Sequence, residues 1–79
     1  MAISAYVLIQ TEVGKASVVA QEAAGVPGVA TADAVTGNYD VIVRAEAESL
    51  DALGGMVVSR LQLIEGITRT LTCPVVHLS

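Results

Sequence analysis

Apolar residues follow two different spacings along this chain of 79 residues. Recurrence at every second position is typical of a strand with one buried face, and recurrence at every third or fourth position is typical of an amphipathic helix. These spacings predict strands over residues 2–10, 29–36, 40–47 and 67–78. They predict helices over residues 14–24 and 50–64, which gives the order strand, helix, strand, strand, helix, strand.

Turn and cap residues support these boundaries. Gly25-Val26-Pro27-Gly28 ends the first helix, and Ser49 is a favourable N-cap for the second. Gly37-Asn38 predicts a hairpin turn, because both residues tolerate positive φ. Gly54-Gly55 lies inside the second helix, where each glycine costs about 1 kcal/mol relative to alanine. We therefore expect another backbone to approach the helix closely there.

This order of elements predicts an α+β fold, the ferredoxin-like sandwich. Right-handed crossovers and the central hairpin favour an antiparallel four-stranded sheet of order 4-1-3-2, with two helices on one face. Pro74 has no amide donor, so the last strand should lie at a sheet edge. The alternation assigns these residues to the helix-facing side: Ile3, Ala5, Val7, Ile9, Ala30, Ala32, Ala34, Val41, Val43 and Ala45.

The opposite side of the predicted sheet is half apolar. It combines aliphatic and aromatic residues with polar ones: Tyr6, Leu8, Val35 and Ile42 with Ser4, Thr31 and Arg44. An exposed face of this composition is a candidate dimer surface.

The composition points to self-association. Hydrophobic residues make up 53% of the chain and aromatic ones only 3%, and the mean hydropathy is +0.66. The longest uncharged stretch, Met1–Thr11, is too short to span a bilayer and has no basic segment before it, so no membrane partner is expected. Apolar surface hidden between copies of the chain explains the composition best.

Charge and cysteine content exclude further classes. The net charge is −4, and the four cations Lys15, Arg44, Arg60 and Arg69 are scattered, which disfavours direct binding of nucleic acid. The single Cys73 excludes an intramolecular disulfide, so a cytoplasmic location is expected.

Candidate chemistry is sparse. Cys73 and His77 lie four residues apart on one predicted strand, about 13 Å, and no other ligand or base accompanies them. Val13–Ser17 lacks the upstream glycine of a phosphate-binding loop, since Ile9 stands there. We therefore expect no metal, no cofactor and no catalytic residue, although a carboxylate pair that forms only in space stays open.

The segment Val35-Thr36-Gly37-Asn38-Tyr39-Asp40 has two interpretations. In the first it is an ordinary hairpin in which Asp40 caps a turn amide. In the second it receives a zwitterion, with backbone amides on the ligand carboxylate and Asp40 on the ammonium. The residues alone favour the ordinary hairpin.

Four motifs together resemble one family. They are Ala5–Ile9, Val26–Val29, the hairpin Val35–Asp40 followed by Val41-Ile42-Val43, and Gly66-Ile67-Thr68-Arg69-Thr70-Leu71-Thr72. The chain resembles the effector-binding (RAM) domain of leucine-responsive/asparagine-type (Lrp/AsnC, feast/famine) transcription regulators over nearly its whole length. This resemblance implies the same fold, dimers formed through the sheets, octamer-like rings of dimers, and amino acids bound between dimers near the hairpin.

The resemblance also implies a ligand site and partners. The implied ligand-binding residues are Val35, Thr36, Gly37, Asn38, Tyr39, Asp40, Thr70 and Thr72, with Cys73 and Pro74 nearby. Pro74 departs from the family pattern, in which a β-branched or long apolar residue is common. Residues 1–79 are expected to form one domain without a helix-turn-helix, so a full-length regulator of the same family is a candidate partner.

Two other functions stay open. One is a small dimeric α/β-barrel isomerase or monooxygenase-like enzyme, which has the same topology and a pocket between sheet and helices. The chain offers no convincing His or Arg constellation for it. The other is a purely structural assembly module with an empty hairpin.

Overall fold

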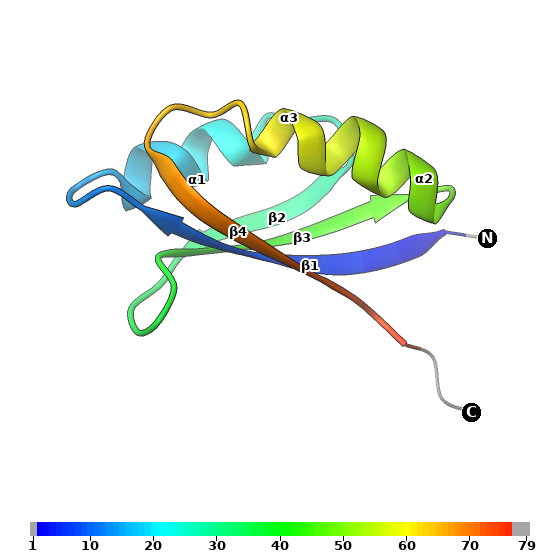
Figure 1. The fold of residues 1–79 in the computed structure, drawn as a ribbon, viewed down its shortest axis with the longest axis horizontal. Helices are drawn as coiled ribbons and strands as arrows, with labels where there is room; N and C mark the ends of the chain where they lie inside the picture. Colours follow the sequence, from blue (N-terminus) through cyan, green and yellow to red (C-terminus); the bar gives the residue numbers. More distant parts are fainter. Residues whose placement is uncertain (1, 77–79) are drawn as a thin grey trace.

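The computed structural model describes residues 2–76 and contains every predicted strand and helix (Figure 1). The elements are β1 (Ile3–Thr11), α1 (Ala16–Ala24), β2 (Val29–Ala34), β3 (Val41–Ala47), α2 (Leu50–Ala52), the π-helical segment η1 (Leu53–Val58), α3 (Ser59–Leu61) and β4 (Ile67–Pro74). The last strand was predicted to reach Leu78, but β4 ends at Pro74 and neither Val75 nor Val76 belongs to it. The rest of that prediction, with His77, lies outside the described residues.

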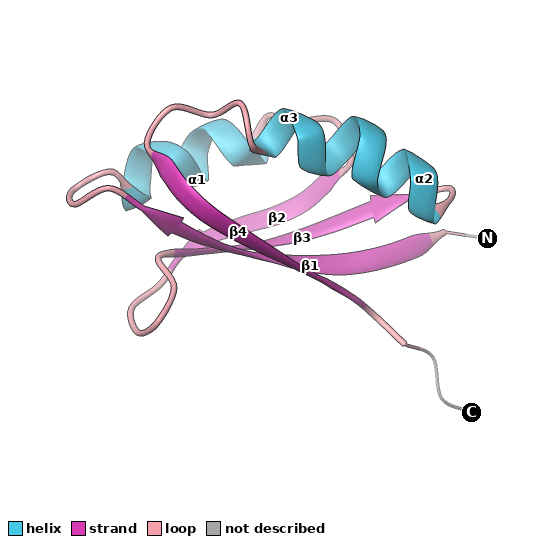
Figure 2. Ribbon diagram, in the orientation of Figure 1, coloured by secondary structure: helices cyan, strands magenta, loops and turns pink. Residues whose placement is uncertain are grey.

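The four strands form one antiparallel sheet of order β2-β3-β1-β4, which confirms the predicted order and the ferredoxin-like α+β fold. Figure 2 shows the helices on one face of the sheet and, among the described residues, no element on the other. Strand β4 is an edge strand, and Pro74 lies at its end opposite Ala5. The edge position explains why a residue without an amide donor is tolerated there.

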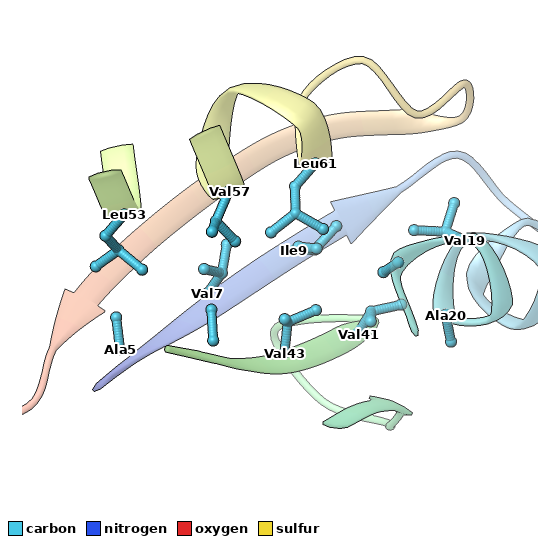
Figure 3. Close-up of a cluster of buried hydrophobic side chains, with 12 residues drawn as sticks. Ala5, Val7, Ile9, Val19, Ala20, Val41, Val43, Leu53, Val57 and Leu61 are labelled. Atoms are coloured by element: carbon cyan, nitrogen blue, oxygen red, sulfur yellow. The ribbon is translucent and has the colours of Figure 1, made fainter. Parts of the chain in front are cut away.

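The core lies between the sheet and the helices (Figure 3). Its sheet side comes from the inward positions of β1 and β3, and its helix side from the apolar stripes of α1 and of the second helical run. The buried hydrophobic residues are Ala5, Val7, Ile9, Val19, Ala20, Ala23, Val41, Val43, Ala45, Leu53, Val57 and Leu61. The predicted inward faces of β1 and β3 are therefore correct at Ala5, Val7, Ile9, Val41, Val43 and Ala45.

Strand β2 departs from the prediction. Its register against β3 shifts between Val29 and Thr31, so Val29 lies opposite Ala45 while Ala32 lies opposite Val43. Ala30 falls at this irregularity and is exposed, so its predicted inward position is wrong. An irregularity of this kind breaks the alternation of faces, which a strict period of two cannot anticipate.

The second helix is one helical run, from α2 through η1 to α3. Its predicted cap is confirmed, because the Ala52 N–H donates to Ser49 Oγ at 3.1 Å. The buried residues Leu53, Val57 and Leu61 are spaced by four, whereas an α-helix has 3.6 residues per turn. In a regular α-helix, residues spaced by four rotate progressively around the helix axis. The wider i→i+5 turns of the π-helical segment reduce this rotation and keep the three side chains on the core.

The close approach expected at Gly54-Gly55 is not made within the chain. A Cβ atom built on either glycine would meet nothing within 4 Å. The two glycines lie instead in the π-helical segment, where Ser59 Oγ donates to the Gly54 carbonyl at 3.0 Å.

Substituting Gly55→Ala should therefore stabilise the chain by about 0.5–1 kcal/mol, because alanine loses less backbone entropy and the added methyl is unobstructed. Urea unfolding at low protein concentration measures the effect. Gly28→Ala is the opposite control, since its Cβ would lie 2.6 Å from Val57 Cγ2 at a φ of +96°. A destabilised Gly55→Ala protein would contradict the open environment of this position.

Candidate functional site

The β2–β3 hairpin loop, Val35–Asp40, is wider than predicted. The Val35 N–H donates to the Asp40 carbonyl at 2.8 Å, while the Asp40 N–H donates to Ile9 of β1 instead of returning to Val35. Gly37 has a φ of +121°, and no non-glycine residue in the described part of the chain has a positive φ. The predicted hairpin is therefore present, but only Gly37 and not Asn38 adopts the positive φ that both residues tolerate.

Three hydrogen bonds connect the hairpin loop to the end of β1. The Asp40 N–H donates to the Ile9 carbonyl at 2.8 Å, and Gln10 Nε2 donates to the Asn38 carbonyl at 3.0 Å. The Thr11 N–H donates to Asp40 Oδ2 at 2.8 Å. The register between β1 and β4 shifts between Gln10 and Thr11, so the carboxylate satisfies an amide at the irregularity. Asp40 therefore caps a backbone amide of β1, and not an amide of the turn as predicted.

The rest of the loop is accessible. Thr36, Gly37 and Asn38 are exposed, and Tyr39 and Asp40 are half-buried. A carboxylate accepts at both oxygens, so Asp40 keeps capacity at Oδ1 while Oδ2 binds the Thr11 amide. The loop therefore offers one carboxylate beside exposed backbone, which is the chemistry that a zwitterion needs.

Thr70 and Thr72 lie on β4, on the other side of β1 from the hairpin loop. They are opposite Ile9 and Val7, and Ile9 also pairs with Val41 of β3. Two strand spacings, about 9–10 Å, therefore separate the backbones at this level of the sheet. Within one chain the structure does not bring the two threonines to the hairpin loop, and their roles in ligand binding stay predictions.

A pocket of about 270 Å³ adjoins Thr70. It lies between the end of α3 and β4 and is lined by Gln62, Ile67, Thr68, Arg69 and Thr70. Gln62 Nε2 donates to Thr70 Oγ1 at 3.1 Å. Gln62 was not predicted as a site residue, since it follows a helix and meets Thr70 only through tertiary folding.

A second, mainly apolar pocket of about 230 Å³ lies near α2. The loop between α1 and β2 forms one wall, and the end of β3 and the second helical run form the others. Its lining residues are Pro27, Gly28, Glu46, Ala47, Glu48, Ala52 and Val57.

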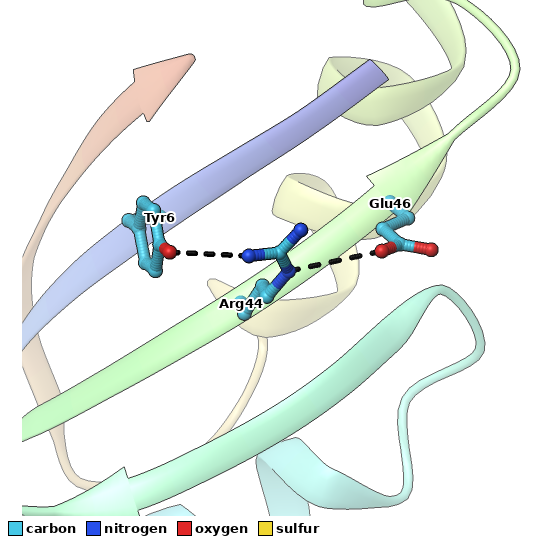
Figure 4. A network of polar contacts seen from close by, with 3 residues as sticks. All are labelled: Tyr6, Arg44 and Glu46. Atoms are coloured by element: carbon cyan, nitrogen blue, oxygen red, sulfur yellow. Dashed lines mark hydrogen bonds and ion pairs between the residues drawn. The ribbon is translucent and has the colours of Figure 1, made fainter. Parts of the chain in front are cut away.

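A small polar network lies on the open face of the sheet (Figure 4). Arg44 Nη1 donates to the Tyr6 hydroxyl at 3.1 Å, and Arg44 Nε lies 3.7 Å from Glu46 Oε2. The Arg44 guanidinium is 5.7 Å from the centroid of the Tyr6 ring. Exposed ion pairs contribute little stability, so this network orients the guanidinium rather than holding the fold together.

Cys73 and Pro74, expected near the ligand site, lie further along β4. Cys73 is half-buried and pairs with Tyr6, while Pro74 pairs with Ala5. Among residues 2–76, no three His, Cys, Asp or Glu side chains gather as a metal ion would require. The helices of this same range are all too short to cross a membrane.

The chain matches the family model of the Lrp/AsnC ligand binding domain over residues 4–77. It is 32% identical over 54 residues to the uncharacterized HTH-type transcriptional regulator PF0250 of Pyrococcus furiosus. That match covers 68% of this chain, and the chain spans only 36% of the relative's length.

Two solved structures extend the comparison. TTHA0845 from Thermus thermophilus is 27% identical, with a TM-score of 0.87 over 98% of this chain and 96% of that one. The L-Met complex of the transcriptional regulator NMB0573 from Neisseria meningitidis is 19% identical, with a TM-score of 0.79 over 95% of this chain and 50% of that one. The second likeness shows a shared fold.

Substituting Asp40→Ala should destabilise the chain by about 1–2 kcal/mol, because the half-buried Thr11 amide loses its charged acceptor. Asp40→Asn should cost less, since its amide oxygen still accepts that hydrogen bond. Urea unfolding compares both variants with Asp33→Ala. Asp33 is an exposed carboxylate on β2 for which no hydrogen bond to a backbone amide is seen. Equal losses in Asp40→Ala and Asp33→Ala would contradict a stabilising role for the Thr11 contact.

Proposed function

The chain belongs to the Lrp/AsnC ligand binding domain family. We propose that it binds an amino acid effector, and that effector binding changes how it acts on a transcription regulator. The observation that supports this most directly is the hairpin loop, an accessible turn with one carboxylate that β1 holds in place. The regulator from N. meningitidis was solved as an L-Met complex, so one protein of this fold takes an amino acid.

In the proposed binding mode the hairpin loop receives the charged groups common to all amino acids. The ligand ammonium lies at the Asp40 carboxylate, where a charge-assisted hydrogen bond is strong. The ligand carboxylate lies at backbone amides of the turn Thr36-Gly37-Asn38. Val35 and Tyr39 flank the turn and complete the ligand-binding loop.

The proposed site is completed by a second copy. Because β1 separates the hairpin loop from Thr70 and Thr72, an effector that touches both is held between copies of the chain. The ligand then contributes to holding the copies together, and assembly depends on its concentration. A homodimer that builds into an octamer-like ring provides this arrangement.

The open sheet face is the proposed dimer surface. Leu8 and Ile42 are half-buried at its centre, and Tyr6 and Leu71 are 40% and 45% exposed. The ladder places both signs of charge on this face: Arg44 and Arg69 with Asp33 and Glu46. The face is therefore balanced in charge although the chain carries −4, so repulsion does not oppose pairing.

The proposed role is regulatory and not catalytic. The isomerase- or monooxygenase-like alternative needs a catalytic pocket between sheet and helices. The centre of that space holds the packed side chains of Val7, Ile9 and Leu61, and the two pockets at its edges are lined by no histidine or cysteine of the described residues. We place the protein in the cytoplasm, acting on transcription through a full-length regulator of the same family. Its scattered cations do not favour direct contact with nucleic acid.

Calorimetric titration of the purified protein with the common amino acids should find at least one that binds. Asp40→Asn should weaken that binding by about tenfold or more, because the charged acceptor of the ammonium is lost. Asparagine keeps an acceptor for the Thr11 amide, so the loop stays in place.

Glu22→Gln removes one negative charge from the exposed side of α1 and is the matched control. Its affinity should equal that of the parent protein. Heat flow absent for every amino acid would refute the proposed function, and a parental affinity in Asp40→Asn would refute the role of Asp40.

Sedimentation should show a particle larger than the 8.1 kDa chain. Leu8→Asp should dissociate it, because a carboxylate at the centre of the open sheet face would lose its hydration when that face is buried. Val18→Asp makes the same kind of change on α1, where the valine is 49% exposed, and should leave the particle intact. A parent protein that sediments as a monomer contradicts the proposed assembly.

A further inference from the structure

The apolar pocket near α2 is already formed in the single chain. Its volume of about 230 Å³ is below the roughly 300–1,000 Å³ of sites that enclose a whole small molecule. The loop of Pro27 and Gly28 is fixed to β3, because the Glu46 N–H donates to the Gly28 carbonyl at 2.8 Å. A Cβ atom at Gly28 would lie 2.6 Å from Val57 Cγ2, so this loop packs directly on the second helical run. The size of the pocket therefore suits one inserted side chain.

The walls of the pocket are aliphatic. Pro27 of the loop, Ala47 of β3, and Ala52 and Val57 of the second helical run contribute methyl and methylene groups. A hydrocarbon chain that enters between them leaves water, which is favourable. The walls therefore fit the stem of a long side chain.

The charge around the pocket is negative. Residues 46–51 hold three of the eight acidic residues of the chain and neither lysine nor arginine. The Glu46 carboxylate lies beside Arg44 on the open sheet face (Figure 4), whereas no ion pair is seen for the exposed Glu48 within the described residues. Asp51, in the first turn of α2, offsets the positive end of that helix. The pocket lining therefore includes one carboxylate, Glu48, that can pair with an incoming cation.

We propose that this pocket is a docking site for a lysine or arginine side chain from a basic segment of a different polypeptide. Side chains of this kind bury an aliphatic stem on apolar surface and keep the charged end in water. The stem lies between Ala47 and Ala52, and the cation lies beside Glu48. The proposal concerns a partner protein and does not depend on effector binding at the hairpin loop.

A second copy of the chain is a poorer occupant. Each copy carries a net charge of −4, so an acidic segment that meets another copy is repelled. Two of the chain's four cations are also engaged elsewhere. The stem of Lys15 packs at Gly66, and Arg44 donates to the Tyr6 hydroxyl. The charge of the pocket therefore favours a basic partner over self-association.

Methyl NMR of the whole assembled protein, with labelled alanine and valine methyl groups, tests the proposal. The probe is Nα-acetyl-L-lysine N-methylamide, whose blocked ends represent a lysine within a chain and cannot replace a free amino acid at the hairpin loop. It should shift the methyl signals of Ala47, Ala52 and Val57 in a saturable way. The norleucine derivative has the same four-carbon stem without the ammonium and should bind about threefold more weakly, as expected when an exposed ion pair is lost. The glycine derivative should leave these signals unshifted.

Ala52→Leu should abolish the saturable shifts at Ala47 and Val57, because the larger side chain fills the pocket. Ala24→Leu makes the same change at an exposed position of α1 and should preserve the shifts. Thermal unfolding verifies that both variants are folded.

Glu48→Gln should make the affinities for the lysine and norleucine probes about equal, because the carboxylate that pairs with the ammonium is lost. Glu48 is exposed, so this variant leaves the core untouched and decides the matter even if Ala52→Leu does not fold. Glu22→Gln, on the exposed side of α1, is the matched control and should preserve the parental preference for lysine.

Each alternative outcome overturns the proposal. Pocket signals that do not shift with the lysine probe show that the pocket does not take this side chain. A parental preference in Glu48→Gln removes the role of the charge. Tighter binding of free L-lysine than of the blocked probe identifies a small-molecule site, and a smaller particle in sedimentation of Glu48→Gln identifies a second copy as the occupant. Effector binding measured by calorimetry is unaffected by any of these results.

Discussion

Pairing of β1 along both of its edges is the interaction on which the rest of the structure depends. It bonds to β3 on one side and to β4 on the other, and so joins the central hairpin to the last strand of the chain. Its inward residues Ala5, Val7 and Ile9 form the centre of the core. Because the helices cover only this side, the same strand presents Tyr6 and Leu8 to solvent on the other.

The end of β1 also determines the geometry of the candidate site. At Gln10 and Thr11 the strand leaves its regular register with β4, and the Thr11 amide bonds to the Asp40 carboxylate instead. Asp40 therefore combines a structural contact with the ligand contact proposed for it. The position of β1 also keeps the hairpin loop apart from Thr70, which is the physical reason for proposing that an effector joins two copies.

The strands and helices were predictable because their apolar residues recur with the correct period over seven or more residues, as in β1, α1 and β3. Local irregularities were not. Ala30 lies at a register shift, Asn38 does not adopt the positive φ that its residue type tolerates, and Gly54-Gly55 lies in a π-helical segment rather than against another backbone. Each of these irregularities depends on how its element packs and pairs within the whole fold. Local propensity carries no information about that packing and pairing.

The sequence by itself determined the order of elements, the buried faces of β1 and β3, the edge position of Pro74 and the hairpin at Val35–Asp40. These follow from periodicity, from a missing amide donor and from short motifs, all of which act locally. Only the tertiary structure decided that Asp40 binds Thr11, that Gln62 meets Thr70 and that β1 lies between the hairpin loop and Thr70. Those contacts join separate elements of the chain, and the way the strands pair sets which of them meet.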